Sequence, residues 1–218
     1  MQGTTNAVFG GRYLEKVSTA VMVRSALLGV IAALLMQLSF TIPIFPGFLS
    51  LDVSDLPALV GAITTGPLTG LLVMLIKNLL DPILFGTTTG GIGNLANFVI
   101  GTALVVPIGL VFRMRRDSVG YIVGSVVGLL SMLLAAGLMN YFVLIPLFSR
   151  IFIPIETIIA IAASMPLPGS ESIDSLLTLI LLSIIPFNVV KGTLVIVLGY
   201  LLYRALKPFL PYLNVKAD

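Results

Sequence analysis

Long apolar stretches, separated by prolines, glycines and short polar runs, dominate the chain. A helix of about 20 predominantly apolar residues is long enough to cross a bilayer. Stretches of this kind, of which the second is short, cover residues 18–40, 55–65, 67–84, 92–112, 118–145 and 174–206. The pattern therefore predicts an all-α integral membrane protein with six transmembrane helices.

Two connections differ from ordinary solvated loops. Residues 41–57 contain Pro43 and Pro46, which cannot continue a helix, yet the segment is largely apolar. We expect it to lie against the protein as a lid-like loop between helices 1 and 2. Residues 146–173 are interrupted too often to form a clear span, and we expect a partly helical excursion along the surface.

Composition supports the membrane interpretation. The chain has 58% hydrophobic and only 10% charged residues, with a mean hydropathy of +1.14, whereas about a quarter of the residues of a soluble domain are charged. Its 218 residues leave no room for a soluble domain beside six spans. We expect one membrane domain, 18–207, between two polar cytoplasmic tails, 1–17 and 208–218, and no cleavable signal peptide.

The residue types present exclude several chemistries. Histidine and cysteine are absent, which removes imidazole bases, thiol nucleophiles and soft metal sites. No phosphate-binding P-loop occurs, and the glycines of "GIGNLA" at 91–96 do not follow a soluble strand. We therefore expect no enzyme activity, no catalytic residue and no metal site.

Basic residues set the expected orientation. Nine of the twelve fall on one side of a six-span topology, which is typical of the cytoplasmic side and places both termini there. The acids predicted at the outer rim are Asp52, Asp55, Asp81, Glu156, Glu171 and Asp174. Such a protein is a multi-pass component of the cell membrane.

Two lysines lie within the predicted spans. Lys77 has Asp81 four residues later, so an ion pair with Asp81 or extension toward the surface accounts for it. Lys191 lies near the bilayer centre, and its helix contains no acid. Because an ammonium group there is unfavourable, it requires a partner. We predict that a bound solute, rather than the protein, neutralises Lys191.

Asparagines accompany Lys191. Asn188 lies three residues before it on the same helical face, and Pro186 predicts a bend with a free carbonyl just ahead. Asn140, Asn94 and Asn97 lie toward the outer ends of their spans, and we expect the five side chains to converge on one pocket in the outer half of the membrane. The alternative for each asparagine is an interhelical hydrogen bond of about 1 kcal/mol.

Small residues at four-residue spacing indicate close helix contacts. Two such stripes are Ser25, Gly29 and Ala33 in the first span and Gly120, Gly124 and Gly128 in the fifth. Spacing alone leaves two interpretations open, internal packing and contact with another subunit.

Three segments carry a family resemblance: "LDVSDLPALVGAITTGPLTGLLVMLIKNLL" at 51–80, "TGGIGNLANFVIG" at 89–101 and "NVVK" at 188–191. The chain resembles, over nearly its whole length, the riboflavin-specific substrate-binding (S) component of energy-coupling factor (ECF) transporters. The resemblance implies a six-helix vitamin binder in the bacterial plasma membrane. It also implies a transmembrane coupling protein and two ABC-type ATPases as partners.

The resemblance also implies residue roles. Asn188 and Lys191 match the Asn-x-x-Lys pair of the family's last helix, and Asn140 matches a ligand-contacting asparagine of the fifth. The residues it places around riboflavin are Asn140, Asn188, Lys191, Asn97, Asn94, Phe45 and Leu49. It directs the stripe Ser25, Gly29 and Ala33 toward the coupling protein.

The expected function is high-affinity riboflavin binding and uptake without ATPase activity, by capture from outside, occlusion under the first loop and transfer through an ATP-driven module. Riboflavin is then the transported ligand rather than a cofactor, and no nucleic acid is involved. Three alternatives remain at this point: an S component for another vitamin, a self-contained secondary transporter or channel, and a membrane-embedded enzyme.

Overall fold

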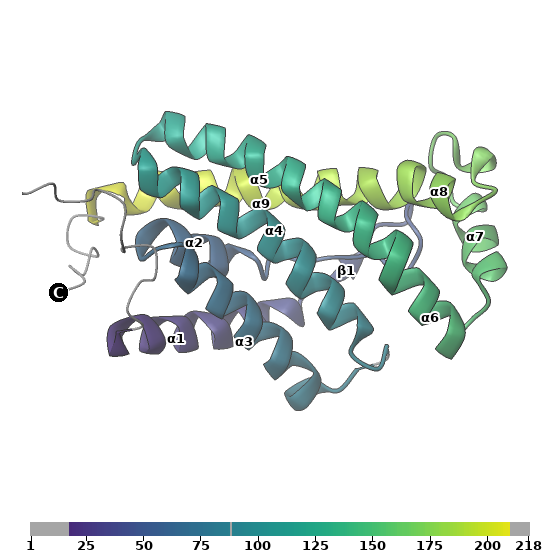
Figure 1. The fold of residues 1–218 in the computed structure, drawn as a ribbon, viewed down its shortest axis with the longest axis horizontal. Coiled ribbons are helices and arrows are strands. Elements are labelled where there is room, and N and C mark those ends of the chain that lie inside the picture. The colour runs from purple at the N-terminus through teal and green to yellow at the C-terminus, as the bar shows by residue number, and fades with distance from the viewer. Residues whose placement is uncertain (1–17, 88, 210–218) are drawn as a thin grey trace, which may run out of the picture.

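The computed structural model describes residues 18–87 and 89–209, and the expected tails at 1–17 and 210–218 lie outside this part of the chain. Long helices run side by side along the longest axis of the molecule (Figure 1). They are α1 (Thr19–Met36), α3 (Pro67–Phe85), α4 (Ile92–Met114), α5 (Ser118–Met139) and α9 (Ile185–Leu206). The start of α1 and the end of α9 lie at the same end of the bundle.

Shorter elements complete the fold. Four are α-helices: α2 (Leu56–Thr64), α6 (Ile145–Ile151), α7 (Ile155–Ala163) and α8 (Leu176–Leu179). The strands β1 (Phe40–Thr41) and β2 (Ser50–Leu51) form a small antiparallel ladder within the first loop. The remaining turns are the π-helices η1 (Asn140–Leu144) and η3 (Ile180–Ile184) and the 3₁₀-helices η2 (Ser170–Ser172) and η4 (Lys207–Phe209).

Five helical stretches within the described residues are long and apolar enough to cross a membrane. They are Thr19–Met36, Pro67–Phe85, Ile92–Met114, Ser118–Ile151 and Leu176–Leu206. The expected second span exists as α2, but its nine residues measure only about 14 Å at 1.5 Å per residue. That length is too short for a hydrocarbon core of about 30 Å. The helical membrane architecture is confirmed, whereas six complete spans are not.

Prolines produce π-helical turns in two of these stretches. Pro146 and Pro186 lack the N–H that would bond the carbonyl four residues earlier. The residues before them bond further back, from Ile145 N–H to Asn140 and from Ile185 N–H to Ile180. The irregularity predicted near Pro186 is therefore present as the π-helix η3.

The glycines of the α5 stripe allow α5 to approach α4 closely. A Cβ at Gly128 would stand 2.6 Å from the carbonyl oxygen of Leu104, and one at Gly124 would stand 3.1 Å from that of Ile108. A side chain at Gly128 would displace the backbone of α4, and one at Gly124 would fit only tightly, so the small residues allow this close packing. Of the two interpretations left open for this stripe, internal packing is the one observed for Gly124 and Gly128.

The α1 stripe is also internal, which corrects its expected role. Ser25, Gly29 and Ala33 are buried, and a Cβ at Gly29 would lie 2.5 Å from Cγ2 of Ile76 on α3. At Gly29, α1 therefore packs against α3 within the chain. The prediction that these three residues face a coupling protein is wrong for this arrangement, because their surface is already covered.

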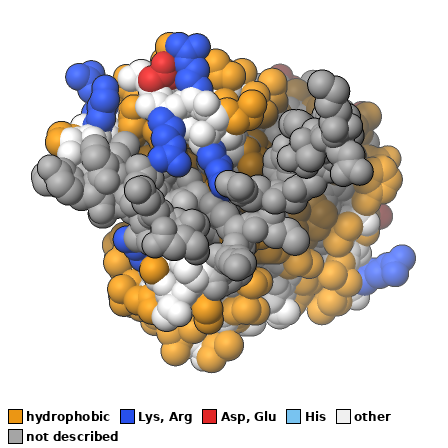
Figure 2. Space-filling view, turned by 60° about the vertical axis from the view of Figure 1, so that its left-hand side comes forward, with side chains coloured by type: hydrophobic (Ala, Val, Ile, Leu, Met, Phe, Trp, Pro, Cys, Tyr) orange, Lys and Arg blue, Asp and Glu red, His pale blue; other side chains and the backbone are white. Residues whose placement is uncertain are grey.

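Basic residues mark one end of the bundle. The arginine-rich turn between α4 and α5, with Arg113 in the last turn of α4, lies at the end where α1 starts and α9 stops (Figure 1). Several Lys and Arg side chains surround that end in Figure 2, while hydrophobic side chains cover much of the visible flanks. The site described next lies in the opposite half, where α1 and α3 end and α9 begins.

Candidate ligand-binding cavity

A cavity of about 660 Å³ lies between the first loop and the helices. Its walls come from the end of α1, the loop before α2, the end of α3, the start of α4, the end of α5 and the start of α9. This volume lies within the range of about 300–1,000 Å³ that is usual for small-molecule sites. The end of α3 and the turn before α4 complete the lining through Phe85, Gly86, Thr87 and Thr89.

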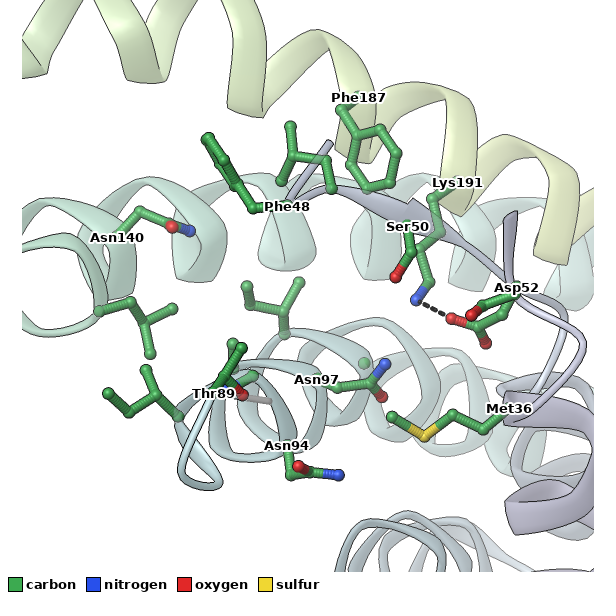
Figure 3. A pocket seen from close by; sticks show the side chains of 18 of the residues that line it. Met36, Phe48, Ser50, Asp52, Thr89, Asn94, Asn97, Asn140, Phe187 and Lys191 are labelled. Carbon is green, nitrogen blue, oxygen red and sulfur yellow. Dashed lines mark hydrogen bonds and ion pairs between the residues drawn. The ribbon is translucent and has the colours of Figure 1, made fainter. Parts of the chain in front are cut away.

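Most of the side chains predicted at the site reach this cavity. Asn94, Asn97, Asn140, Asn188 and Lys191 all line it, as does Leu49. Figure 3 shows Asn94 and Asn97 on one wall, Asn140 at a distance along the cavity, and Lys191 reaching in from α9. The expected convergence of these residues on one pocket is present in the structure.

Phe45 does not join them. It is 4% exposed and packs edge-to-face against Phe187, with 5.4 Å between the ring centroids. Phe48, three residues later, lines the cavity instead, together with Phe187. Phe45 supports the aromatic wall from behind.

Lys191 is paired within the protein. Its Nζ lies 2.8 Å from Oδ2 of Asp52, a loop residue 139 positions earlier in the chain. Burial raises the pKa of Asp52, but the Lys191 and Lys77 cations, together with the hydrogen bonds from Lys191 and Ser54, lower that pKa below its ordinary value. The prediction that a solute rather than the protein neutralises Lys191 is therefore wrong. The cavity nevertheless borders both members of the pair.

Lys77 has a different partner from the one predicted. Its Nζ lies 2.5 Å from Oδ1 of Asp55 and 2.7 Å from Oγ of Ser54, and its side chain is completely buried. Ser54 also donates from its backbone N–H, at 2.9 Å, and from its hydroxyl to Oδ1 of Asp52. The two lysine–aspartate pairs thus meet at Ser54 in the first loop.

Asp81, expected to pair with Lys77, binds two amides instead. Its Oδ1 accepts from Nε2 of Gln37 at 2.5 Å, and its Oδ2 accepts from Nδ2 of Asn94 at 2.7 Å. Asp81 and Gln37 both line the cavity. These contacts tie the ends of α1 and α3 to the start of α4.

Three of the acids predicted on the outer side are buried in the protein. Asp52, Asp55 and Asp81 are 4%, 0% and 8% exposed, so protein encloses them. Sequence reasoning assigned them no role at the site. The sequence offered one general signal: two lysines within the predicted spans required partners, and these three acids were predicted on the outer side.

Asn140 and Asn188 are each oriented by a hydrogen bond to the backbone one helical turn earlier. Asn140 donates from Nδ2 to the carbonyl of Ala136, and Asn188 donates to that of Ile184, both at 2.8 Å. Each amide therefore keeps a carbonyl oxygen and a second N–H for another partner.

Among the described residues, no group of three or more acidic side chains is placed to hold a metal ion.

The chain is similar to known proteins. A family model described as "ECF transporter, substrate-specific component" matches residues 20–203. The riboflavin transporter RibU of Staphylococcus aureus (strain TCH60) is 32% identical over 201 residues, 92% of this chain and 97% of that protein. The riboflavin transporter FmnP of Bacillus subtilis (strain 168) is 31% identical over 187 residues, 85% of this chain and 90% of that protein.

A solved structure described as the S component of a bacterial ECF transporter has a similar fold. It superposes with a TM-score of 0.67 at 28% identity, covering 88% of this chain and 97% of that one. The resemblance seen in the sequence is thereby confirmed, and the chain belongs to the family of substrate-specific components of ECF transporters.

Proposed function

We propose that this chain is the riboflavin-binding subunit of an ECF-type importer. The observation that carries the proposal is the cavity of about 660 Å³ that Asn140, Asn188 and Lys191 share, in a chain whose relatives at 32% and 31% identity are riboflavin transporters. The chain binds the vitamin, and the energy for uptake comes from partner subunits.

The lining complements a flavin. An isoalloxazine ring combines an apolar dimethylbenzene edge with a uracil-like edge that alternates donors and acceptors. Phe48, Phe187 and Leu49 supply apolar surface, and the amides of Asn140 and Asn188 can both donate and accept. The ammonium group of Lys191 has three donors. Asp52 takes one, which leaves donors for a ring carbonyl.

The first loop forms one wall of the cavity in this arrangement. Leu49, Ser50 and Asp52 line it, and Asp52 holds the loop to α9 through Lys191. We propose that the loop moves when the ligand enters, with loss of the Asp52–Lys191 contact or a rearrangement around it. Gating by loop motion is common in enzymes and binding proteins that enclose small ligands.

The orientation follows from the basic end. With both termini and the α4–α5 turn in the cytoplasm, the arginines obey the positive-inside rule, and the cavity opens toward the outside. In this topology α2 counts as a sixth, incomplete span. The protein would then be a multi-pass component of a bacterial plasma membrane.

The partners are a transmembrane coupling protein and two ABC-type ATPases. Because Ser25, Gly29 and Ala33 are buried within the chain, the coupling protein must contact another surface. The chain itself acts neither as an ATPase nor as a catalyst of another reaction.

Reconstitution tests this function. Proteoliposomes holding the chain alone should retain riboflavin without accumulating it, and accumulation should begin when the ATPases, the coupling protein and ATP are added. Accumulation by the chain alone would favour a secondary transporter. Retention of another vitamin but not riboflavin would favour a different S component.

A further inference from the structure

The walls of the cavity differ in chemistry. Phe48 and Phe187 lie on one side in Figure 3, and Thr89, Asn94 and Asn97 lie on the opposite side. Asp81 belongs to this second wall, since it binds Asn94 directly and lines the cavity. A flat aromatic ring suits the first wall, and a polar chain suits the second.

Charge also differs between the ionisable residues of the lining, which are Asp52, Asp55, Asp81 and Lys191. Asp52 is paired with Lys191, and Asp55 with Lys77. Asp81 differs from both aspartates, because its two hydrogen bonds come from neutral amides. The polar wall therefore carries negative charge that no described ion pair compensates.

The same wall has acceptor capacity to spare. A carboxylate has about four lone-pair positions, and Gln37 and Asn94 occupy two on Asp81. The Oδ1 atom of Asn97 is buried and accepts no hydrogen bond from the described residues. Hydroxyl groups can supply the matching donors. A phosphate ester at neutral pH offers mainly acceptors and carries about −1.5 to −2 charges.

We propose that Asp81, held in place by Gln37 and Asn94, is a specificity-determining residue that receives the hydroxyl-bearing side chain of the ligand and disfavours its phosphorylated form. This inference rests on the proposed function, because it assigns the two parts of riboflavin to the two walls. The flavin ring lies on the aromatic side, and the ribityl chain points toward Asp81. The site thereby prefers the free vitamin to flavin mononucleotide.

Three flavins separate the contributions in a binding experiment on the full chain in detergent. Riboflavin has ring and ribityl chain, flavin mononucleotide adds the phosphate, and lumiflavin lacks the ribityl chain. Wild-type protein should bind riboflavin more tightly than flavin mononucleotide. Asp81→Asn should weaken riboflavin binding about 10-fold, since hydrogen bonds to charged groups contribute more than neutral ones.

The ratio of the two dissociation constants is the decisive quantity. In Asp81→Asn, the preference for riboflavin over flavin mononucleotide should fall by about 10-fold or more, because a repulsive charge is removed. Lumiflavin affinity should change by less than about 3-fold, which also shows that the variant is folded. Asp117→Asn is the matched control, because Asp117 caps α5 outside the cavity and asparagine caps about equally well.

Other results overturn the inference. Equal wild-type affinities for riboflavin and flavin mononucleotide, or an unchanged ratio in Asp81→Asn, would remove Asp81 from ligand selection. Parallel loss of lumiflavin and riboflavin binding would make Asp81 a purely structural residue. Failure of the wild-type protein to bind any of the three flavins would instead overturn the proposed function, and this inference with it.

Discussion

Two buried lysines invite comparison, because they have the same chemistry and different surroundings. Lys77 on α3 and Lys191 on α9 each bind an aspartate of the first loop, Asp55 and Asp52 respectively. Lys77 is 0% exposed and lies outside the lining of the cavity, whereas Lys191 is 7% exposed and lines it. One ion pair is enclosed by protein, and the other has a side available to a ligand.

The difference shows that a lysine within a membrane helix does not by itself reveal its role. A buried pair is a weak source of net stability, but removing one partner leaves an uncompensated charge. For Lys77 that charge would remain inside closely packed protein. For Lys191 it would border a cavity of about 660 Å³. We therefore expect Lys77 to act mainly on folding and Lys191 mainly on binding.

Lys77→Met should have the largest effect on stability. The change leaves Asp55 buried without its cation, and breaking a buried pair from one side costs about 3–5 kcal/mol. A thermal unfolding curve of the detergent-solubilised protein should show a clearly lower midpoint. The double variant Lys77→Met with Asp55→Leu should recover part of the loss, because no buried charge remains. An unchanged midpoint in Lys77→Met would contradict the structural role.

Lys191→Met should have the largest effect on the ligand. Loss of a charged donor to a flavin carbonyl should weaken riboflavin binding by about 10- to 100-fold, from about 1.5–3 kcal/mol per such bond. The unfolding midpoint should fall less than in Lys77→Met, because Asp52 keeps its bonds to Ser54. Adding Asp52→Asn should restore stability but not affinity. A greater loss of stability than of binding would reverse the comparison.

Asp52→Asn should act on ligand exchange. The amide keeps the shape of the side chain, but its single carbonyl oxygen can accept from Ser54 or from Lys191 and not from both. The loop also loses its ionic link to α9. Because the loop forms one wall of the cavity, riboflavin should dissociate faster, by roughly 10-fold if a charge-assisted bond is replaced by a neutral one. Stopped-flow fluorescence measures this rate. The same dissociation rate as in the wild-type protein would mean that the ion pair does not hold the loop closed.

Ser54→Ala should have the smallest effect, and it should lower both the stability of the protein and its affinity for riboflavin. Ser54 Oγ bonds Lys77 at 2.7 Å and also bonds Asp52, so it joins the two pairs. Its removal should cost about 1–3 kcal/mol of stability and only a few-fold in riboflavin affinity. Thr64→Ala is a suitable control, because its hydroxyl bonds only a carbonyl of its own helix. If Ser54→Ala and this control had the same stability and the same riboflavin affinity, the two lysine–aspartate pairs would be independent of each other.

Apolar length and residue spacing were sufficient to predict much of this fold. Local patterns predict the long helices and the helix irregularity near Pro186. They also predict the pocket that Asn94, Asn97, Asn140, Asn188 and Lys191 share. Each helix carries its own periodicity, and its polar face must turn away from lipid. The short α2 was also visible, although its nine residues cannot complete a span.

The ion-pair partners could not be predicted in the same way. Asp52 lies 139 residues from Lys191 in a loop without periodicity, so nothing local connects them. The spacing of Lys77 and Asp81 indicated a pair, but the buried Asp55 at the start of α2 lies closer to the ammonium group. Local rules failed where the tertiary contacts of the first loop decided the outcome.

The sequence also did not show which neighbour each apolar or small side chain faces. The stripe of Ser25, Gly29 and Ala33 showed that α1 packs closely against another element, but its spacing did not reveal that the element is α3. Phe45 and Phe48 are equally apolar members of the same loop. Only the folded arrangement turns Phe45 toward the back of Phe187 and Phe48 toward the cavity.

A riboflavin titration of three proteins tests the central claim most directly. The wild type, Lys191→Met and Lys77→Met are compared by quenching of flavin fluorescence, at a temperature where all three remain folded. The account predicts tight, saturable binding to the wild type, a large loss in Lys191→Met and near wild-type affinity in folded Lys77→Met. Equal affinities for the wild type and Lys191→Met, or a greater loss in Lys77→Met, would contradict it.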